Sequence, residues 1–261
     1  MAAPGAGTGN WVGASSAALD SDGDLFIAYR VRTRDQRGSG IVIAHSQDGT
    51  RPRTVATLLK ESFGAESLER PALVRTENGW RIYVSCATPG SKHWRIDAID
   101  ARDPSMLGTA KPRTVFPGSG EVGVKDPVVR KRGDTWEAWI CCHPLDEPGE
   151  EDRMTTAFAT SHDGLDWEWQ GTVLAGRPGT WDARGARVTA VLPDGRAAYD
   201  GRATKEENFS ERTGLVEPRS DAPIANVRYL DVVPSPDGYF LFFERPLPDG
   251  SHDLCVQLVP L

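Results

Sequence analysis

The sequence lacks the sustained 3.6-residue apolar period of a long amphipathic helix, and residues 203–213 (ATKEENFSERT) are the single candidate for a helical turn or a long loop. It also lacks an apolar run long enough to span a bilayer, so we expect no membrane partner. The first residues, MAAPGAGTGNW, contain neither the basic nor the apolar stretch of a secretory signal. We therefore expect residues 1–10 to form a short flexible leader of a cytoplasmic protein.

Basic residues are outnumbered by acidic ones, with 30 Lys and Arg against 37 Asp and Glu and a net charge of −7. Nucleic acids are bound mainly through neutralisation of their phosphates, so this balance argues against a nucleic-acid partner. The oligomeric state has no signal in the sequence.

Cysteine is scarce: the four are Cys86, Cys141, Cys142 and Cys255, and no two of them form a CxxC motif. The side chains of the adjacent pair would point to opposite faces of a strand. Metal-ligand spacing is therefore absent, and His143 beside Cys142 does not supply it. We expect reduced, mostly buried thiols, and neither a metal site nor a cofactor.

Glycine and proline are abundant, at 27 and 19 residues, which indicates many turns between short strands. Five segments repeat one pattern at a spacing of roughly 45 to 60 residues: an apolar strand, a turn that ends in glycine, and a second alternating strand. The copies are GASSAALDSDGDLFIAYRVR from Gly13, ERPALVRTENGWRIYVSC from Glu69, KDPVVRKRGDTWEAWICC from Lys125, RGARVTAVLPDGRAAYDGR from Arg184 and YLDVVPSPDGYFLFFER from Tyr229. Their turn glycines are Gly23, Gly79, Gly133, Gly195 and Gly238.

Five copies of a four-stranded unit predict an all-β fold, a five-bladed β-propeller with four-stranded antiparallel blades. Residues 11–261 would form this single domain, with blades over 11–60, 61–118, 119–176, 177–220 and 221–261. In the third blade the segment TAFATSHDGLDWEWQ follows the hairpin, and its Asp-Gly suits a tight turn. We expect Trp167 and Trp169, just beyond this turn, to pack between neighbouring sheets.

A shared register links the innermost strands of three blades. Asp126 and Asp231 both lie seven residues before their turn glycine, as Ser16 does. The innermost strands of a propeller line its central channel. Because Asp126, Asp231, Ser16 and Arg70 all lie at strand entries, we expect them to converge on one cavity mouth.

The motifs KDP at Lys125, ERPALV at Glu69, SHDGLDW at Ser161 and YDGRATKEENFSERTGL at Tyr199 resemble those of the five-bladed propeller glycosidases. That assembly includes the arabinanase and β-xylosidase group, the levanase and invertase group, and the mannoside phosphorylases. The resemblance implies three acids around the scissile bond: a base or nucleophile, a middle acid, and a general acid. Asp126 matches the middle acid, and Ser16 stands where the first-blade acid is expected. The candidates for the general acid, by residue type alone, are Glu69, Glu207 and Glu211.

The candidate residues in the second and third blades each have a structural alternative. Asp126 could bind backbone amides at a strand start. Glu69 and Arg70 could be a site acid with the cation that favours its ionised form, or an ion pair at a blade junction. His143, at the end of a strand, could donate to a substrate or serve only the structure.

The fourth blade supplies an aromatic and several charges. Trp181, Asp182 and Arg184, in TWDARGARV, could form a sugar platform, although Trp181 could also pack between blades. Asp200 and Arg202, in YDGR, end a strand and could bind substrate, or the Asp-Gly could only form a turn.

The long insert and the fifth blade complete the candidate site. Glu211 and Arg212 lie in the insert, and loops that interrupt a regular scaffold often carry function. Arg228, Tyr229 and Asp231 are the contribution of the fifth blade. The positions of Arg70, Arg184, Arg212 and Arg228 would bring several guanidinium groups to one mouth, which favours a carboxylated or phosphorylated substrate.

Two classes of function are expected. The first is a glycoside hydrolase-like enzyme, or a phosphorylase, acting on a small and anionic saccharide or glycoside, with Asp126 as an essential carboxylate. Glu211 is the better proton donor, because Arg70 would lower the pKa of Glu69. The second class is a propeller that has lost this chemistry and binds carbohydrate or catalyses another reaction on a small metabolite, which the missing first-blade acid favours. A protein-interaction propeller ranks last, because the candidate ring is polar and charged.

Overall fold

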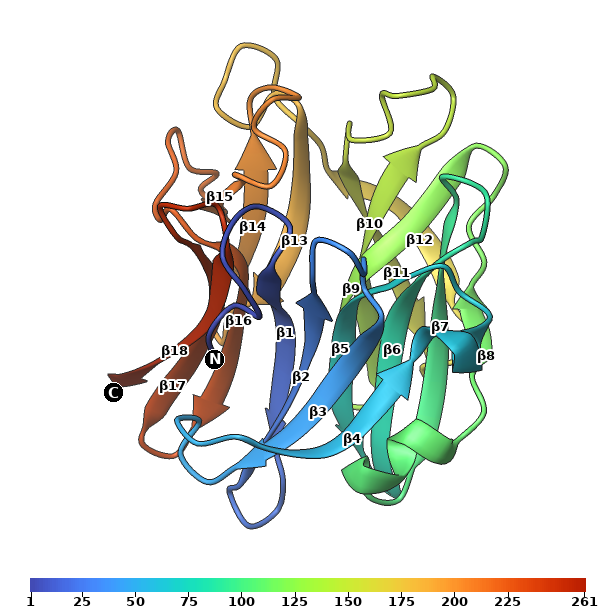
Figure 1. Cartoon of the computed structure of the whole chain (residues 1–261), viewed down its shortest axis with the longest axis vertical. Helices are drawn as coiled ribbons and strands as arrows, with labels where there is room; N and C mark the ends of the chain where they lie inside the picture. The colour runs from blue at the N-terminus through green and yellow to red at the C-terminus, as the bar shows by residue number, and fades with distance from the viewer.

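The computed structural model describes residues 1–261, which form 18 strands and two short 3-10 helices (Figure 1). The strands make four sheets. The largest has seven strands and consists of two antiparallel groups, β1–β4 and β16–β18, that meet through one parallel pairing of Trp11 with His252. The expectation of an all-β fold is confirmed.

The bounds of the strands follow the chain. The first group comprises β1 (Trp11–Leu19), β2 (Leu25–Arg32), β3 (Gly40–Ser46) and β4 (Arg53–Leu59). The second comprises β5 (Leu68–Thr76), β6 (Gly79–Ala87), β7 (Trp94–Ala101) and β8 (Arg113–Phe116). The third comprises β9 (Val122–Arg132), β10 (Thr135–Pro144), β11 (Thr155–Ser161) and β12 (Glu168–Leu174). The fourth comprises β13 (Gly185–Val191), β14 (Ala197–Arg202) and β15 (Arg212–Val216). The last comprises β16 (Arg228–Ser235), β17 (Gly238–Pro246) and β18 (His252–Pro260). The 3-10 helices are Lys60–Phe63 and Pro104–Thr109.

A tight hairpin opens every group of strands. The pairs β1–β2, β5–β6, β9–β10, β13–β14 and β16–β17 are all antiparallel. The turn glycines Gly23, Gly79, Gly133, Gly195 and Gly238 all have positive φ, between +59° and +144°. Residues with a Cβ rarely adopt this conformation, so glycine is required there. The five predicted hairpins are confirmed.

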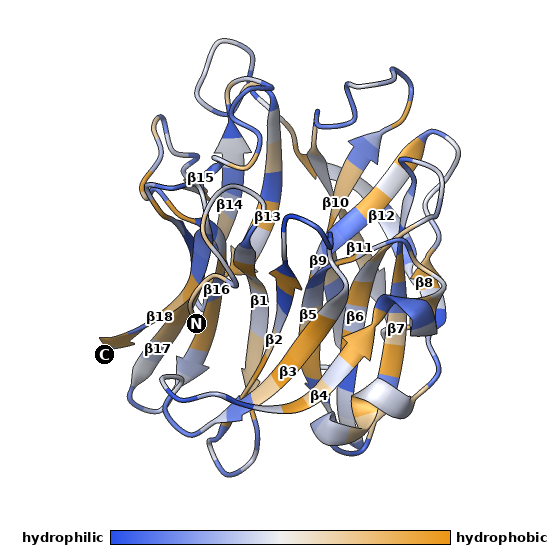
Figure 2. Ribbon diagram, in the orientation of Figure 1, coloured by the Kyte–Doolittle hydropathy of each residue, from blue (hydrophilic) through white to orange (hydrophobic).

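The first strands of the groups contact one another in a closed ring: β1 with β5, β5 with β9, β9 with β13, β13 with β16, and β16 with β1. Buried apolar side chains fill the spaces between neighbouring sheets. One core cluster, for example, joins Ile41 and Ile43 of β3 to Ile82 and Val84 of β6. Most of the apolar segments accordingly lie on the strands, and the loops at their ends are more polar (Figure 2).

Two groups have three strands instead of the four that the repeat predicted. After β15, residues 217–227 form no further strand and pair with β15 through the isolated bridge of Thr213 with Ala225. Pro218 and Pro223 in this segment lack the N–H that a strand ladder needs. Residues 203–211 form a loop with turns and no helix.

Residues 1–10 form neither helix nor strand and lie against β18. The amino group of Met1 donates to the carbonyl oxygen of Leu254 at 2.6 Å, and the amide of Ala3 donates to Oδ1 of Asp253 at 2.8 Å. The structure contains no helix with the length and apolar character needed to cross a membrane.

Candidate functional site

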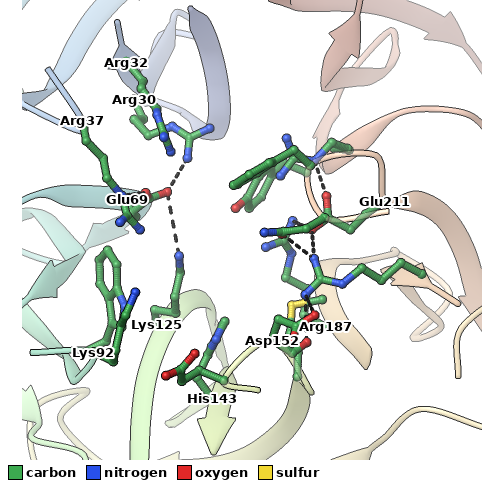
Figure 3. Close-up of a pocket in the computed structure, with 18 residues that line it drawn as sticks. Arg30, Arg32, Arg37, Glu69, Lys92, Lys125, His143, Asp152, Arg187 and Glu211 are labelled. Carbon is green, nitrogen blue, oxygen red and sulfur yellow. Dashed lines mark hydrogen bonds and ion pairs between the residues drawn. The ribbon is translucent and has the colours of Figure 1, made fainter. Parts of the chain in front are cut away.

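The N-terminal ends of the innermost strands surround a pocket of about 180 Å³, here called the central pocket (Figure 3). Eight of its side chains are cationic: Arg30, Arg32, Arg37, Lys92, Lys125, Arg187, Arg202 and Arg228. Four are anionic: Glu69, Glu151, Asp152 and Glu211. The others are Trp94, His143, Met154, Asn208, Phe209 and Tyr229. The volume is below the roughly 300 Å³ at which sites for drug-sized ligands begin, so the pocket suits one small unit.

A β-bulge interrupts every innermost strand within the ring. In three strands a bulged residue has φ near +50°: Ala14, Asp126 and Tyr229. These residues are therefore structurally equivalent. Lys125 and Arg228, each directly before a bulge, line the central pocket.

The register predicted by counting from the turn glycines is wrong. Asp126 lies seven residues before its glycine, whereas Ala14 and Tyr229 lie nine residues before theirs. Asp231 and Ser16 are thus two residues beyond the bulge instead of being equivalent to Asp126. A shift of two residues keeps each side chain on the same face of the strand, so the alternation in the sequence does not reveal it.

Glu69 lies in the pocket wall among cations. Arg30 donates a hydrogen bond to its carboxylate, and Nζ of Lys125 lies 3.8 Å from its Oε2. The Nε of Arg37 lies 3.9 Å from the other oxygen. Burial alone would raise the pKa of Glu69, but these positive charges outweigh burial and hold the pKa well below its usual range. Glu69 is an ionised carboxylate near neutral pH.

Glu211 lies on the opposite side of the pocket (Figure 3) and is also surrounded by cations. Arg202 NH1 donates to its Oε1 at 2.7 Å, and Arg228 Nε lies 2.6 Å from its Oε2. Burial opposes ionisation, but the charges of Arg228, Arg187 and Arg202 lower the pKa of Glu211 to about 2. Both glutamates favour the ionised form, so the surrounding cations disfavour the proton-donor role expected for one of them.

Asp126 is fully buried directly behind the pocket wall. Its Oδ2 accepts hydrogen bonds from Arg187 NH1 at 3.0 Å and from the Tyr229 hydroxyl at 3.3 Å, whereas its Oδ1 has no partner. Arg187 also donates to Asp200 at 2.9 Å. Burial raises the pKa of Asp200 even though Arg187 is adjacent. Both aspartates therefore position Arg187, which lines the pocket, instead of facing the pocket themselves.

The remaining residues predicted for the cavity mouth lie elsewhere in the ring. Ser16 Oγ accepts from the amide of Leu73 at 2.9 Å, and Asp231 Oδ2 accepts from the amide of Ala17 at 2.8 Å. Arg70 is buried and donates to a backbone carbonyl in β13 instead of pairing with Glu69. Burial raises the pKa of Asp231 to about 6, and Arg70 partly opposes the shift. None of Ser16, Asp231, Arg70 and Asp126 lines the central pocket.

The predicted sugar platform in the fourth group is a packing unit. The Trp181 ring stacks on Tyr199, with ring centroids 5.5 Å apart, and it lies so close to Gly214 that a Cβ there would be 2.7 Å from it. Asp182 is fully buried and accepts hydrogen bonds from the Tyr199 hydroxyl and from Arg219. The packing alternative therefore holds for Trp181.

Arg184 and Arg212 lie outside the pocket and are bound by other acids. Arg184 NH2 lies 2.6 Å from Oδ1 of Asp152, which lines the pocket. Arg184 therefore lies behind Asp152 and does not line the pocket itself. Arg212 NH2 lies 3.0 Å from Oε1 of Glu207. Of the four arginines expected at the mouth, only Arg228 lines the pocket.

His143 lines the pocket as a neutral imidazole. Burial and the charge of Lys125 lower its pKa to about 3. Its Nε2 is buried without a hydrogen-bond partner.

Sequence reasoning missed most of the cations of the pocket. Lys125 and Arg187 had a detectable signal, because both lie near the start of the first strand of a repeat copy, as Glu69 and Arg228 do. Arg30 and Arg32, at the end of β2, had no such signal. Their alternation with apolar residues predicts only a strand with these side chains on its polar face.

No group of three or more His, Cys, Asp or Glu side chains is arranged to hold a metal ion. The four cysteines are free, and Cys86, Cys141 and Cys142 are buried. The pocket itself therefore offers three kinds of charged group, namely carboxylate, guanidinium and ammonium, together with one neutral imidazole.

No protein-family model and no curated protein matches the sequence. Solved structures do match the fold. An α-L-arabinofuranosidase from Lactobacillus brevis has a TM-score of 0.69 at 16% identity, over 94% of this chain and 90% of that chain. A β-1,2-mannobiose phosphorylase from Listeria innocua, in complex with β-1,2-mannobiose, has a TM-score of 0.66 at 15% identity, over 98% and 90%.

A third similar structure is a sucrose-6-phosphate hydrolase from Lactobacillus gasseri, with a TM-score of 0.67 at 8% identity, over 97% of this chain and 59% of that chain. Identities this low establish the fold and not the activity. These structures represent the three groups that the sequence motifs resemble. The chain therefore has the fold of the propeller glycosidases.

Proposed function

We propose that the protein is a five-bladed glycosidase-like propeller that takes up a small anionic saccharide in the central pocket. The five strand groups, whose first strands contact in a ring, support reading each group as one blade. The structural neighbours that act on or bind sugars support a saccharide ligand. One of them is named for a phosphorylated sugar.

The observation that carries the proposal is a set of under-paired cations on one side of the pocket. Arg32 and Lys92 have no carboxylate within ion-pair distance, and Arg37 and Lys125 reach carboxylates only at 3.8 to 3.9 Å. Three of the four, Arg32, Arg37 and Lys125, lie over aromatic rings. The Arg32 guanidinium lies 4.5 Å from the centroid of Trp11, and Lys125 Nζ lies 4.3 Å from that of Trp94. A carboxylate or phosphate would supply the missing acceptor.

The binding role is favoured over cleavage by two carboxylates. Such cleavage requires one carboxyl group that keeps its proton, usually through a raised pKa. Glu69 and Glu211 have lowered pKa values instead. The first innermost strand has Gly13 and Ala14 at the bulge and offers no acid there.

Cleavage is a second candidate because Glu69 and Glu211 face each other across the pocket (Figure 3). An anionic substrate that draws Arg30 or Lys125 away from Glu69 would raise the pKa of Glu69 and let it carry a proton. In a phosphorolytic version, inorganic phosphate would bind the same cations. Turnover of anionic aryl glycosides, with and without phosphate, that is lost in Glu69→Gln would favour this candidate.

Calorimetry with matched sugars tests the binding proposal. The titrants are glucuronic acid, galacturonic acid and glucose 6-phosphate, with glucose and galactose as neutral partners. We expect at least one anionic sugar to bind and its neutral partner not to bind. Lys125→Met should weaken that binding by about 10- to 100-fold, since a charge-assisted hydrogen bond contributes about 1.5–3 kcal/mol. Binding should also weaken as salt is raised.

Arg75→Met is the matched control, because Arg75 is exposed at the far end of β5, the strand that carries Glu69. It removes the same charge from the protein without touching the pocket. Equal affinity for an anionic sugar and its neutral counterpart would refute an anionic ligand in this pocket. Equal losses of affinity in the Lys125→Met and Arg75→Met variants would refute it as well.

A further inference from the structure

An apolar groove lies on the outside of the second and third strand groups. It has a volume of about 360 Å³ and is lined mainly by Val115, Phe116, Val122, Val124, Trp167 and Trp169. Phe116 belongs to β8, at the right edge of the view in Figure 1, and its ring centroid lies 6.2 Å from that of Trp169, which belongs to β12. The groove therefore joins the outer edges of two neighbouring sheets.

The two tryptophans of the groove differ in burial. Trp167 packs between sheets as predicted, with its ring centroid 5.1 Å from that of Phe116 and 6.2 Å from that of Tyr83. Its indole N–H is nevertheless buried without an acceptor. Trp169 does not fill the space between the sheets and leaves 49% of its surface exposed. The groove thus presents one open aromatic ring, that of Trp169, beside the buried ring of Trp167.

A depression on the rim connects this groove to the central pocket. It shares Lys92 and Glu151 with the central pocket, and it shares Ser119 with the apolar groove. Strand β9 forms the wall between the two sites, because its neighbouring residues point to opposite faces. Lys125 faces the central pocket, and Val124 faces the groove.

The connection is short and built from close backbone contacts. Phe116 of the groove pairs with Ile96, two residues beyond Trp94 of the pocket. The Cα atom of Phe116 is therefore roughly 8 Å from that of Trp94, two residues along one strand and one strand spacing across. A Cβ on Gly118 would lie 2.8 Å from His93, and one on Gly123 would lie 3.0 Å from the amide of Trp94. Residues 118–123 are thereby held against the pocket wall, which fixes the rim.

We propose that the ligand is an oligosaccharide whose anionic unit occupies the central pocket and whose neutral part crosses the rim and stacks on Trp169. This inference rests on the proposed function. The central pocket has room for one small unit only, so further units must leave it over the rim. Sugar rings have an apolar face and polar edges. The exposed Trp169 ring matches that face, and polar side chains at the rim, such as Lys92 and Ser119, match the hydroxyl groups.

The test compares short and long ligands that carry the same anionic unit. The short probes are the anionic monosaccharides used above, and the long probes are tetrasaccharides with that unit linked to three neutral sugars. For the unit that binds the pocket, the tetrasaccharide should bind at least about tenfold more tightly. Trp169→Ala should abolish this gain and leave monosaccharide binding unchanged. Trp169→Phe, which retains a ring, should retain part of the gain.

Val173→Ala is the matched control, since Val173 is 52% exposed on the same strand and does not line the groove. It should leave both affinities unchanged. Monosaccharide binding with no gain for any tetrasaccharide would overturn this inference and leave the proposed function standing. A gain that persists in Trp169→Ala would also overturn it. Failure of every anionic monosaccharide to bind would instead refute the proposed function, and this inference with it.

Discussion

Carboxylates around the ring have opposite protonation preferences, although burial acts to raise the pKa of each of them. Glu211 has three guanidinium groups close to it, and their charges outweigh burial and lower its pKa to about 2. Asp231 has mainly Arg70, and burial raises its pKa to about 6. The number of nearby cations, and not burial itself, therefore decides which carboxylate is ionised.

Asp231→Asn should stabilise the protein above pH 6. The folded-state pKa of about 6 exceeds the ordinary value of 3.8, so the contribution of Asp231 to stability is fully present below pH 3.8 and is lost as the pH rises through 6. The full shift corresponds to about 3 kcal/mol. Asp231 remains partly exposed, so we expect a gain of about 1–2 kcal/mol at pH 8.

Urea unfolding at pH 4 and pH 8 measures this gain. Asp237→Asn is the matched control, because it makes the same chemical change at an exposed position near the end of the same strand. A gain that is equal at both pH values, or that Asp237→Asn also produces, would show that Asp231 is not protonated in the folded protein.

Strand β1 has a glycine, Gly13, in the ring because a side chain of the last strand group, that of Glu244, occupies the space beside it. A Cβ on Gly13 would lie 2.2 Å from Oε2 of Glu244. Glu244 Oε1 in turn accepts from Arg228 NH1 at 2.8 Å and lies 2.6 Å from Nδ1 of His252. Because Gly13 has no side chain, the carboxylate of Glu244 in β17 can lie beside β1 and pair with Arg228.

Gly13→Ala should destabilise the protein by about 1–3 kcal/mol, because the methyl group overpacks a region held by ion pairs. Thermal and urea unfolding measure the loss. Gly120→Ala is the control, since a Cβ there meets nothing within 4 Å. Equal stability of the two variants would mean that Glu244 can move aside without cost.

A chain of alternating charges links the strand groups across the whole molecule. Arg30 of β2 binds Glu69 of β5 and lies 3.2 Å from Glu244 of β17. Glu244 pairs with Arg228, which pairs with Glu211. Arg30 is thus an ionic link between the first, second and last strand groups.

Arg30→Met should destabilise the protein by about 3–5 kcal/mol, because it leaves buried carboxylates without their partner. Urea unfolding measures the loss, and Arg30→Met combined with Glu69→Gln should recover part of it, since one unpaired charge is then removed. Arg196→Met, which breaks an exposed ion pair with Asp194, should cause little or no change. No recovery in the double variant would show that Arg30 acts through packing alone.

Local patterns were sufficient to predict the first two strands of every group, the five hairpins and the turn glycines. Alternation has the period of a strand, and positive φ restricts a turn to glycine, so each signal needs only neighbouring residues. Glu69, Glu211, Arg228 and His143 were also predicted for the site and do line the central pocket. Each lies at or near the end of a strand or in the insert, where the repeat brings side chains to the ring.

The tertiary structure alone decided which charges meet. The bulges differ in distance from the turn glycine by two residues, a shift that alternation cannot detect, so Asp231 and Ser16 were placed wrongly. The cations around Glu69 and Glu211 come from strands far apart in the chain, and they decide that both glutamates are ionised. Sequence determines local conformation and periodicity here, whereas protonation depends on charges that only folding brings within a few ångströms.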